Sequence, residues 1–360
     1  MNDVTASMFR MLQWHERIEA ERQLPGARPF ISDHAGGHPF ADDYLGELAE
    51  PTREALGEAT RHPTADEDAA LRRRIALLHR RYDGVDYGPA RVIPGGGPTA
   101  FISTFCVWLL LAGLTRVRYV PPVDPTFAYL FRRFGIEPVP VCRRHAVAPG
   151  VRLDLPDEST VLVLTDPVGY MGRRVPERVM AEIGAWQRAT GSLVFVDGTF
   201  QYMRWDGGRA ERSAALPVER TLRLVCPARY LSLPGYRSAY LLSPEEYREE
   251  LAELHENLHG DATLADRRFA HRAVDLMLGE GNGALIEHAR DNHRRLAASG
   301  ALAAQAPIET GYFLFARPAV PPEGFLALDQ RHFELEDHPG FVRIDLLNTQ
   351  GIEAMVAATA

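Results

Sequence analysis

Residues able to bind an anion or hold a proton stand at separated points of this sequence. Gly95–Thr99 reads GGGPT and precedes an apolar segment, while Asp197 follows an apolar run. Arg237 follows a turn glycine, and Arg343 lies within an apolar stretch. Backbone N–H groups at a helix start suit a phosphate, and a guanidinium among apolar residues needs an anionic partner, either structural or a ligand. Each of these residues alone could serve only as a turn, a helix cap or part of a structural ion pair. We predict a binding site because the residues occur together.

Alternating strands and helices would position these residues. The spacing of Leu71, Ile75 and Leu78 predicts an amphipathic helix over 66–82. Short apolar runs predict strands at 90–93, 116–120, 138–141, 161–164, 193–196, 222–225 and 239–242, with helices at 100–114, 127–134 and 176–190 between them. This alternation indicates an α/β fold with a mostly parallel sheet covered on both faces, whose strand-end loops bind ligands.

The pattern changes after Pro244. Helices are predicted at 245–257, 264–279 and 284–298, then strands at 311–316 and 341–346 and a C-terminal helix. We therefore expect an N-terminal arm at 1–60, with a short helix near 7–21, that packs with the small domain or a partner. A large α/β domain is expected over 61–250 and a small α+β domain over 251–360.

Taken together and in this order, these pieces resemble the fold-type I enzymes that depend on pyridoxal phosphate (PLP), specifically the class I/II aminotransferases. The resemblance extends from the helix at Asp66 to the strand at Arg343. It implies the PLP-transferase fold of type I, in which a large domain holds a seven-stranded, mostly parallel sheet between helices. A smaller α+β domain would follow at the C-terminus.

The resemblance implies a phosphate site. Gly96, Gly97 and Thr99 would hold the cofactor phosphate at a helix N-terminus, and Arg237 would pair with it through two N–H groups. Cys226 stands where the family has a phosphate-contacting serine, so one polar contact is changed.

The resemblance also implies a ring site and a carboxylate site. Phe127 would stack on the pyridine ring, and Asp197 would keep the ring nitrogen protonated, which makes the ring an electron sink. Arg343 would clamp the α-carboxylate of an amino acid. Gly169 and Phe200 replace the asparagine and the tyrosine that hydrogen-bond the ring oxygen in the family.

The largest departure concerns the lysine with which the family binds its cofactor covalently. That lysine would lie eight residues before Arg237, where this chain has Arg229, and all 40 basic Lys/Arg residues of the chain are arginine. A guanidinium stays protonated and is a poor nucleophile and a weak base. A covalent Schiff base to a side chain is therefore excluded.

Two hypotheses of function follow. The first is a divergent biosynthetic enzyme acting on an amino-acid-derived or phosphorylated ligand. PLP or its amine form, PMP, would be bound non-covalently, or the cationic cleft would hold the ligand with no cofactor. Its candidate catalytic residues are Arg229, Tyr170 and Tyr230, the tyrosines as proton carriers. The alternative is an inactive pseudoenzyme, or scaffold subunit, that pairs with an active homologue.

Composition limits the other classes. The 360 residues are 46% hydrophobic and 24% charged, which is typical of a globular protein. A net charge of −8 without a basic stripe argues against nucleic acid. Three separated cysteines, the absence of zinc-like Cys/His spacing and an N-terminus unlike a signal peptide favour a cytoplasmic protein without a metal site. The longest apolar stretch is too short to cross a membrane. We expect a homodimer that binds a small amino-acid-like molecule.

Overall fold

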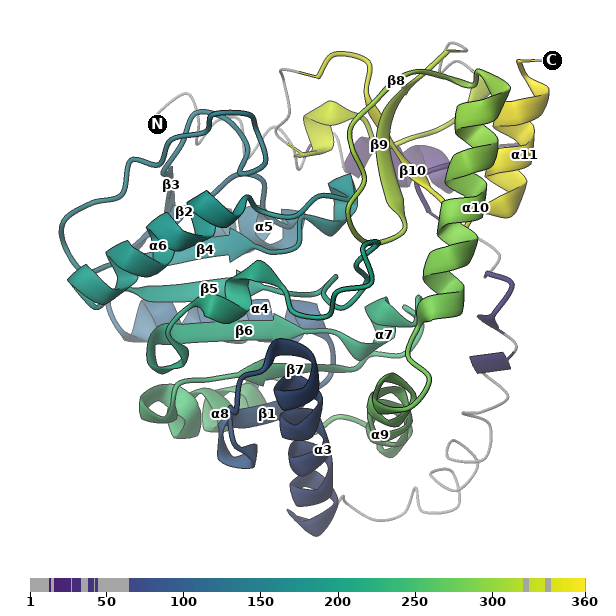
Figure 1. The fold of residues 1–360 in the computed structure, drawn as a ribbon. Helices are drawn as coiled ribbons and strands as arrows, with labels where there is room; N and C mark the ends of the chain where they lie inside the picture. The colour runs from purple at the N-terminus through teal and green to yellow at the C-terminus, as the bar shows by residue number, and fades with distance from the viewer. Residues whose placement is uncertain are drawn as a thin grey trace.

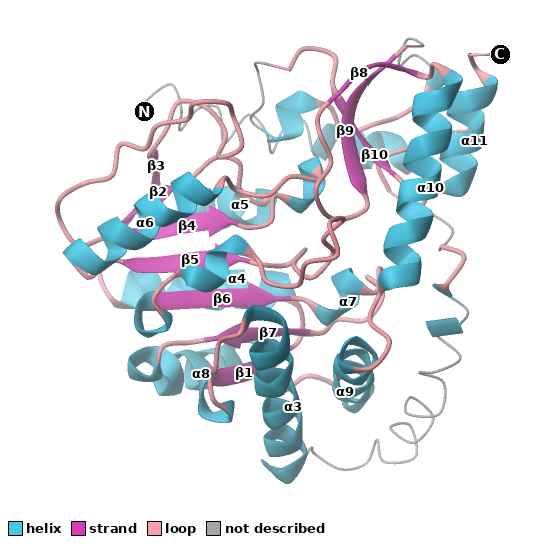
Figure 2. Ribbon diagram, viewed as in Figure 1, coloured by secondary structure: helices cyan, strands magenta, loops and turns pink. Residues whose placement is uncertain are grey.

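The computed structural model describes residues 65–319, 324–333 and 338–359, with N-terminal stretches at 13, 16–26, 28–33, 38–41 and 43–44. A seven-stranded sheet lies between helices, and a three-stranded sheet lies beside the C-terminal helices (Figures 1 and 2). The predicted fold class is therefore confirmed. Much of the arm predicted at 1–60 lies outside the described residues, although 16–22 are helical as expected.

The large sheet is parallel at its centre. Its strand order is β1-β7-β6-β5-β4-β2-β3. The strands are β1 (Val92–Gly95), β2 (Arg116–Tyr119), β3 (Glu137–Pro140), β4 (Val161–Thr165), β5 (Leu193–Asp197), β6 (Thr221–Val225) and β7 (Ala239–Leu242). Only β7 pairs antiparallel, with β1 and β6. Parallel neighbours bring the carboxyl ends of β4, β5 and β6 to one edge, which is where sheets of this kind bind ligands.

Helices cover both faces of this sheet (Figure 2). They are α3 (Ala65–Asp83), α4 (Pro98–Leu111), α5 (Pro125–Phe134), α6 (Glu177–Thr190) and α8 (Glu245–His259). Along β4, Val161 and Val163 pack with α4 and α5, whereas Leu162 and Leu164 pack with α6. Because both faces of the strand are buried, its sequence is a continuous apolar run.

Residues at the starts of α4 and α5 explain why these two helices begin at the carboxyl edge of the sheet. Pro98 is the first residue of α4 and follows Gly97, whose φ of 105° is unfavourable for other residues. The Asp124 side chain caps α5 by accepting a 2.8 Å hydrogen bond from the Thr126 N–H. These caps fix the turns that face the site.

The C-terminal part forms a smaller α+β unit. It comprises α10 (Gly283–Ser299), β8 (Leu302–Gln305), β9 (Phe313–Pro318), β10 (Val342–Asp345) and α11 (Thr349–Ala357), with antiparallel strand order β10-β9-β8. The preceding helix α9 (Leu264–Leu278) packs instead against α3 (Figure 1). The predicted boundary after residue 250 falls inside α8, which packs against α4. The domain limits stay a prediction.

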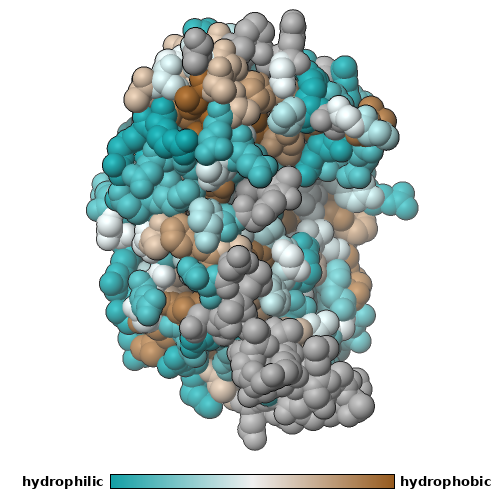
Figure 3. All heavy atoms as spheres, turned by 90° about the vertical axis from the view of Figure 1, so that its right-hand side faces the viewer, coloured by the Kyte–Doolittle hydropathy of each residue, from teal (hydrophilic) through white to brown (hydrophobic). Residues whose placement is uncertain are grey.

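The hydropathy of the surface and the length of the helices were compared with what a membrane-spanning protein needs. On the face in Figure 3, hydrophobic residues form small patches among hydrophilic ones. No helix in the described part of the chain is both long and apolar enough to span a bilayer.

Candidate active site

Asp197 ends β5 as a buried carboxylate with few polar neighbours. The backbone N–H of Thr199 donates to Asp197 Oδ1 at 3.1 Å, and the Thr199 hydroxyl donates to the same oxygen. Burial and the nearby charge of Asp124 raise the pKa of Asp197 to about 6, against the effect of these hydrogen bonds and of Arg229. The carboxyl group therefore lacks a positive partner strong enough to offset its burial.

An arginine lies against the glycine-rich turn. A Cβ atom on Gly97 would come within 3.2 Å of the Arg237 guanidinium, so only glycine leaves this approach open. Thr99, the second residue of α4, is exposed. The structure thus brings Gly97 and Arg237 together at a helix start, as an anion site requires, whereas no atom lies within 4 Å of a Cβ built on Gly96.

Cys226, which stands where the family has a phosphate-contacting serine, hydrogen-bonds to the backbone. Its thiol donates to the Ser238 carbonyl at 3.3 Å, and burial raises its pKa. The thiol is thus engaged with backbone and held in its protonated form.

Arg229 lies on the short helix α7 (Pro227–Tyr230), at the position of the family's lysine. Its guanidinium lies 5.5 Å from the Phe200 ring centroid. Burial alone would lower its pKa, but Tyr312, Cys226 and nearby carboxylates, including Asp33, hold the pKa above its ordinary value. Arg229 is therefore a permanent cation in this site.

Phe200 fills the space left by the missing side chain at Gly169. A Cβ atom on Gly169 would lie 2.3 Å from both Cβ and Cγ of Phe200. The two departures from the family pattern are therefore one coupled change: the glycine admits the phenylalanine, and both lack a polar contact for a ring oxygen.

Arg343 projects from β10 into an aromatic setting. Its guanidinium lies 4.3 Å from the Phe313 ring centroid and 5.8 Å from that of Phe333. Its Nε donates to the Ser32 carbonyl at 3.1 Å. Burial lowers the pKa of Arg343, while Asp33 and Asp345 act against that change. The guanidinium is thus braced by rings and backbone and can meet a carboxylate.

A cavity of about 270 Å³ brings several of these groups together. Its lining includes Asp124, Tyr170, Phe200, Arg229, His332 and Arg343. Among the predicted catalytic and substrate residues, Tyr170, Arg229 and Arg343 therefore share one cavity.

Two predicted site residues lie in the core instead. Phe127 is fully buried, with ring centroids of Phe131 and Phe195 at 5.7 Å and 5.5 Å, so its ring packs beneath the sheet rather than at the cavity. Tyr230 is also fully buried and packs beside Tyr202, with ring centroids 6.3 Å apart. The roles predicted for Phe127 and Tyr230 therefore have no support from the lining of this cavity.

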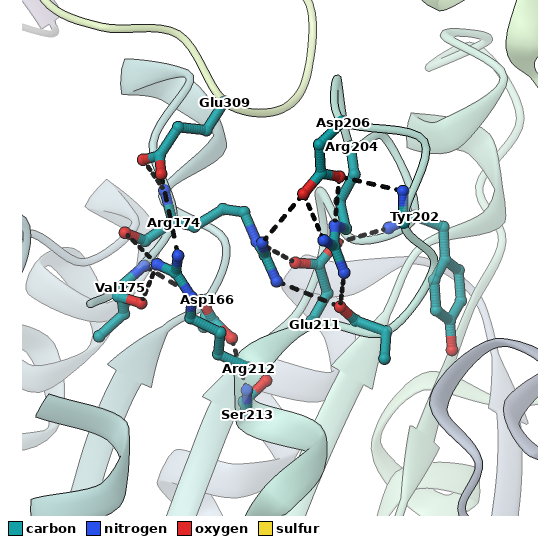
Figure 4. Close-up of polar contacts among 12 residues, drawn as sticks. Asp166, Arg174, Val175, Tyr202, Arg204, Asp206, Glu211, Arg212, Ser213 and Glu309 are labelled. Carbon is teal, nitrogen blue, oxygen red and sulfur yellow. Dashed lines mark hydrogen bonds and ion pairs between the residues drawn. The ribbon is translucent and has the colours of Figure 1, made fainter. Parts of the chain in front are cut away.

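A buried polar network that the sequence did not reveal joins the loops after β4 and β5 (Figure 4). Glu211 accepts hydrogen bonds from the Tyr202 N–H at 3.1 Å and from Arg174 Nε at 3.3 Å. Burial and the neighbouring Asp166 raise the pKa of Glu211 to about 8. Asp166 in turn accepts hydrogen bonds from backbone N–H groups, including that of Ser213 at 2.8 Å. The network fixes the loops after β4 and β5.

Metal binding finds no support in the described ranges, where no cluster of three or more His, Cys, Asp or Glu residues could hold an ion. The cysteines there, Cys106, Cys142 and Cys226, are buried and unpaired with one another.

A glycine-rich turn beside Arg237 and the buried Asp197 thus lie at the carboxyl edge of the large sheet, and Arg343 lines the cavity from β10. Residues 41–304 match the family described as aminotransferase class I and II. The chain belongs to this family, as the sequence resemblance predicted.

Curated relatives are distant. The protein named probable N-succinyldiaminopimelate aminotransferase DapC of Mycobacterium tuberculosis (strain ATCC 25618 / H37Rv) is 24% identical over 221 residues, which are 58% of this chain and 55% of that protein. The chain thus spans about half the length of the curated relatives it matches.

Solved structures share the whole fold. N-succinyldiaminopimelate aminotransferase from Mycobacterium tuberculosis superposes with a TM-score of 0.74 at 20% identity, covering 100% of this chain and 98% of that one. YbdL from Escherichia coli, reported with a methionine aminotransferase function, gives 0.75 at 15% identity and covers 100% and 96%. At these identities the likeness supports the fold.

Proposed function

We propose that this protein is a divergent biosynthetic enzyme that binds PLP or PMP non-covalently and acts at the α-carbon of an amino-acid-derived ligand. One observation carries the proposal. Arg237 beside Gly97 and the buried Asp197 keep both ends of a cofactor site, while Arg229 stands in the place of the attaching lysine. A buried carboxylate without a strong cationic partner is costly, and a bound cofactor would supply Asp197 with that partner.

The residues present can bind two groups of PLP, its phosphate and its ring nitrogen. Arg237 and the turn at Gly97 can bind the phosphate, and a protonated ring nitrogen would give Asp197 the cation that its surroundings lack. Gly169 and Phe200 offer no hydrogen bond to the ring hydroxyl. When bound, PLP would supply an electron sink for charge that develops at the ligand's α-carbon.

The arginines suggest the class of ligand. Arg343 can orient an α-carboxylate through its planar fork. Arg229 cannot act as nucleophile or base, but it lines the same cavity and can bind a second anionic group. This supports a ligand with an additional carboxylate or phosphate. The name of the curated relatives makes N-succinyldiaminopimelate the first compound to test.

The test is cofactor binding by the purified protein. PLP and PMP, followed by absorbance and calorimetry, should bind reversibly, and unphosphorylated pyridoxal should bind less tightly. Arg237→Ala should weaken PLP binding about 10- to 100-fold, the contribution of a charge-assisted contact, and leave pyridoxal binding unchanged.

Arg294→Ala, which removes an exposed guanidinium on α10, is the matched control and should change neither affinity. Absence of PLP and PMP binding by the wild type would contradict the proposal and favour the alternative, an inactive scaffold subunit.

A further inference from the structure

A histidine and an aspartate from the small domain form a hydrogen-bonded pair at the cavity. His332 lines the cavity and is only 2% exposed. Its Nδ1 lies 3.3 Å from Asp329 Oδ1. Arg331 also pairs with Asp329, its Nε donating at 2.8 Å, and these contacts lower the pKa of Asp329 to about 2 despite burial. Asp329 is therefore a carboxylate that accepts from the ring and fixes its orientation.

The backbone ties this pair to the predicted substrate arginine. Arg343 N–H donates to the Leu328 carbonyl at 2.8 Å, and Asp329 forms a bridge with Val342 of β10. The next residue after the histidine, Phe333, stacks on Tyr170 with ring centroids 5.2 Å apart. The segment that carries His332 is thus held against the strand that carries Arg343.

The cavity is small enough for one ligand to contact several of its lining groups. A volume of about 270 Å³ corresponds to roughly nine liquid waters. A molecule of amino-acid size held by Arg343 would therefore meet the histidine in the same cavity. Imidazole is the side chain that most often acts as a general base, and the described lining of this cavity includes the ring of His332.

We propose that His332, oriented by Asp329, moves the proton at the α-carbon of the bound ligand, the task for which this chain has no lysine. This rests on the function proposed above. The C–H bond breaks with its electron pair left on the ligand, and the proton forms a bond with the imidazole of His332. The proton then returns to the ligand or passes to water. His332 is the catalytic residue and Asp329 a positioning residue.

The experiment separates binding from proton transfer. Wild type, His332→Gln and Asp329→Asn are incubated in D₂O with PLP and, in turn, each common L-amino acid and N-succinyldiaminopimelate. Loss of the α-proton signal is followed by NMR, and PLP binding by calorimetry. For at least one ligand the wild type should exchange the proton. His332→Gln should exchange it about 10²- to 10⁴-fold more slowly, the usual contribution of general base catalysis, with unchanged PLP affinity. His293→Gln on α10 is the matched control.

A readout independent of turnover tests the positioning role. In ¹⁵N-histidine spectra of the protein without cofactor, His332 should carry its proton on Nδ1, and Asp329→Asn should change that tautomer. Added imidazole should partly restore exchange to His332→Ala.

The outcomes distinguish the two proposals. Exchange at the wild-type rate in His332→Gln, or no exchange by a wild type that binds PLP, would overturn the role of His332 and leave cofactor binding in place. A wild type that binds neither PLP nor PMP would overturn both.

Discussion

At position 229, where the family resemblance implies a lysine, this chain has an arginine whose guanidinium contacts a second departure from the family pattern. The cation lies over the Phe200 ring, and Phe200 occupies the space above Gly169. The sequence resemblance predicted each replacement separately: Arg229 by counting back from Arg237, Gly169 from the loop at 166–172, and Phe200 from its place near Asp197. Their contact could not be predicted, because side-chain direction depends on packing between loops distant in sequence.

Asp197 gives a prediction about pH. Its pKa is raised from the ordinary 3.8 to about 6, so ionisation in the folded protein costs about 3 kcal/mol at 1.4 kcal/mol per pH unit. The contribution of Asp197 to stability without cofactor should therefore be greatest below pH 4 and be lost as the pH rises through 6. Asp197→Asn should remove this loss, making the variant the more stable form at pH 7 in urea unfolding. It should also bind PLP more weakly. An equal pH dependence in both proteins would contradict the assignment.

The Gly169–Phe200 contact gives a second prediction. Gly169→Ala should lower the free energy of unfolding by about 1–3 kcal/mol, because its Cβ would overlap Phe200. In a Phe200→Gly background the same change should cost at least about 1 kcal/mol less, as chemical denaturation of the four proteins would show. Gly283→Ala has open space around it and serves as the control. Additive losses would mean that the two positions are independent.

At the scale of elements, the sequence predicted almost every strand of the large sheet, since doubly buried strands such as β4 and β5 are short apolar runs. It missed β8, whose alanines and alternating exposure carry little signal. It also missed the pair His332–Asp329. Those residues reach the cavity through contacts between Ser32 and the segment around Leu328 and Arg343, about 300 residues apart.

Glu309 joins the small unit to the large one (Figure 4) and gives an element-scale prediction. Its carboxylate accepts from Arg173 Nε at 2.9 Å and from the Arg174 N–H at 3.2 Å. Despite burial, these contacts lower its pKa, so the stabilisation is present above the ordinary pKa of 4.5 and is lost as the pH falls below it. Glu309→Ala should cost about 1–3 kcal/mol at pH 7 and little in acid.

The measurement is urea unfolding at both pH values, with hydrogen exchange in residues 168–173, which should become faster in Glu309→Ala. Glu256→Ala, which removes an exposed carboxylate of α8, is the control. Unchanged exchange in 168–173 would show that Glu309 does not hold that loop.

At the scale of the whole molecule, the family and the fold were predictable because order and spacing survive where individual residues have changed. The homodimer stays a prediction. Sedimentation equilibrium should give a mass of twice 40.1 kDa. A mass of 40.1 kDa at micromolar concentration would contradict it, and co-purification with a lysine-containing homologue would favour the scaffold alternative instead.

The central claim is that the cofactor is held without a covalent bond because Arg229 replaces an amine. Intact mass spectrometry after incubation with PLP and borohydride reduction tests it most directly. The wild type should gain no pyridoxyl group on an interior side chain, whereas Arg229→Lys, with the chain's single lysine, should gain one. A pyridoxyl adduct on an interior residue of the wild type, or none on Arg229→Lys despite PLP binding, would contradict the account.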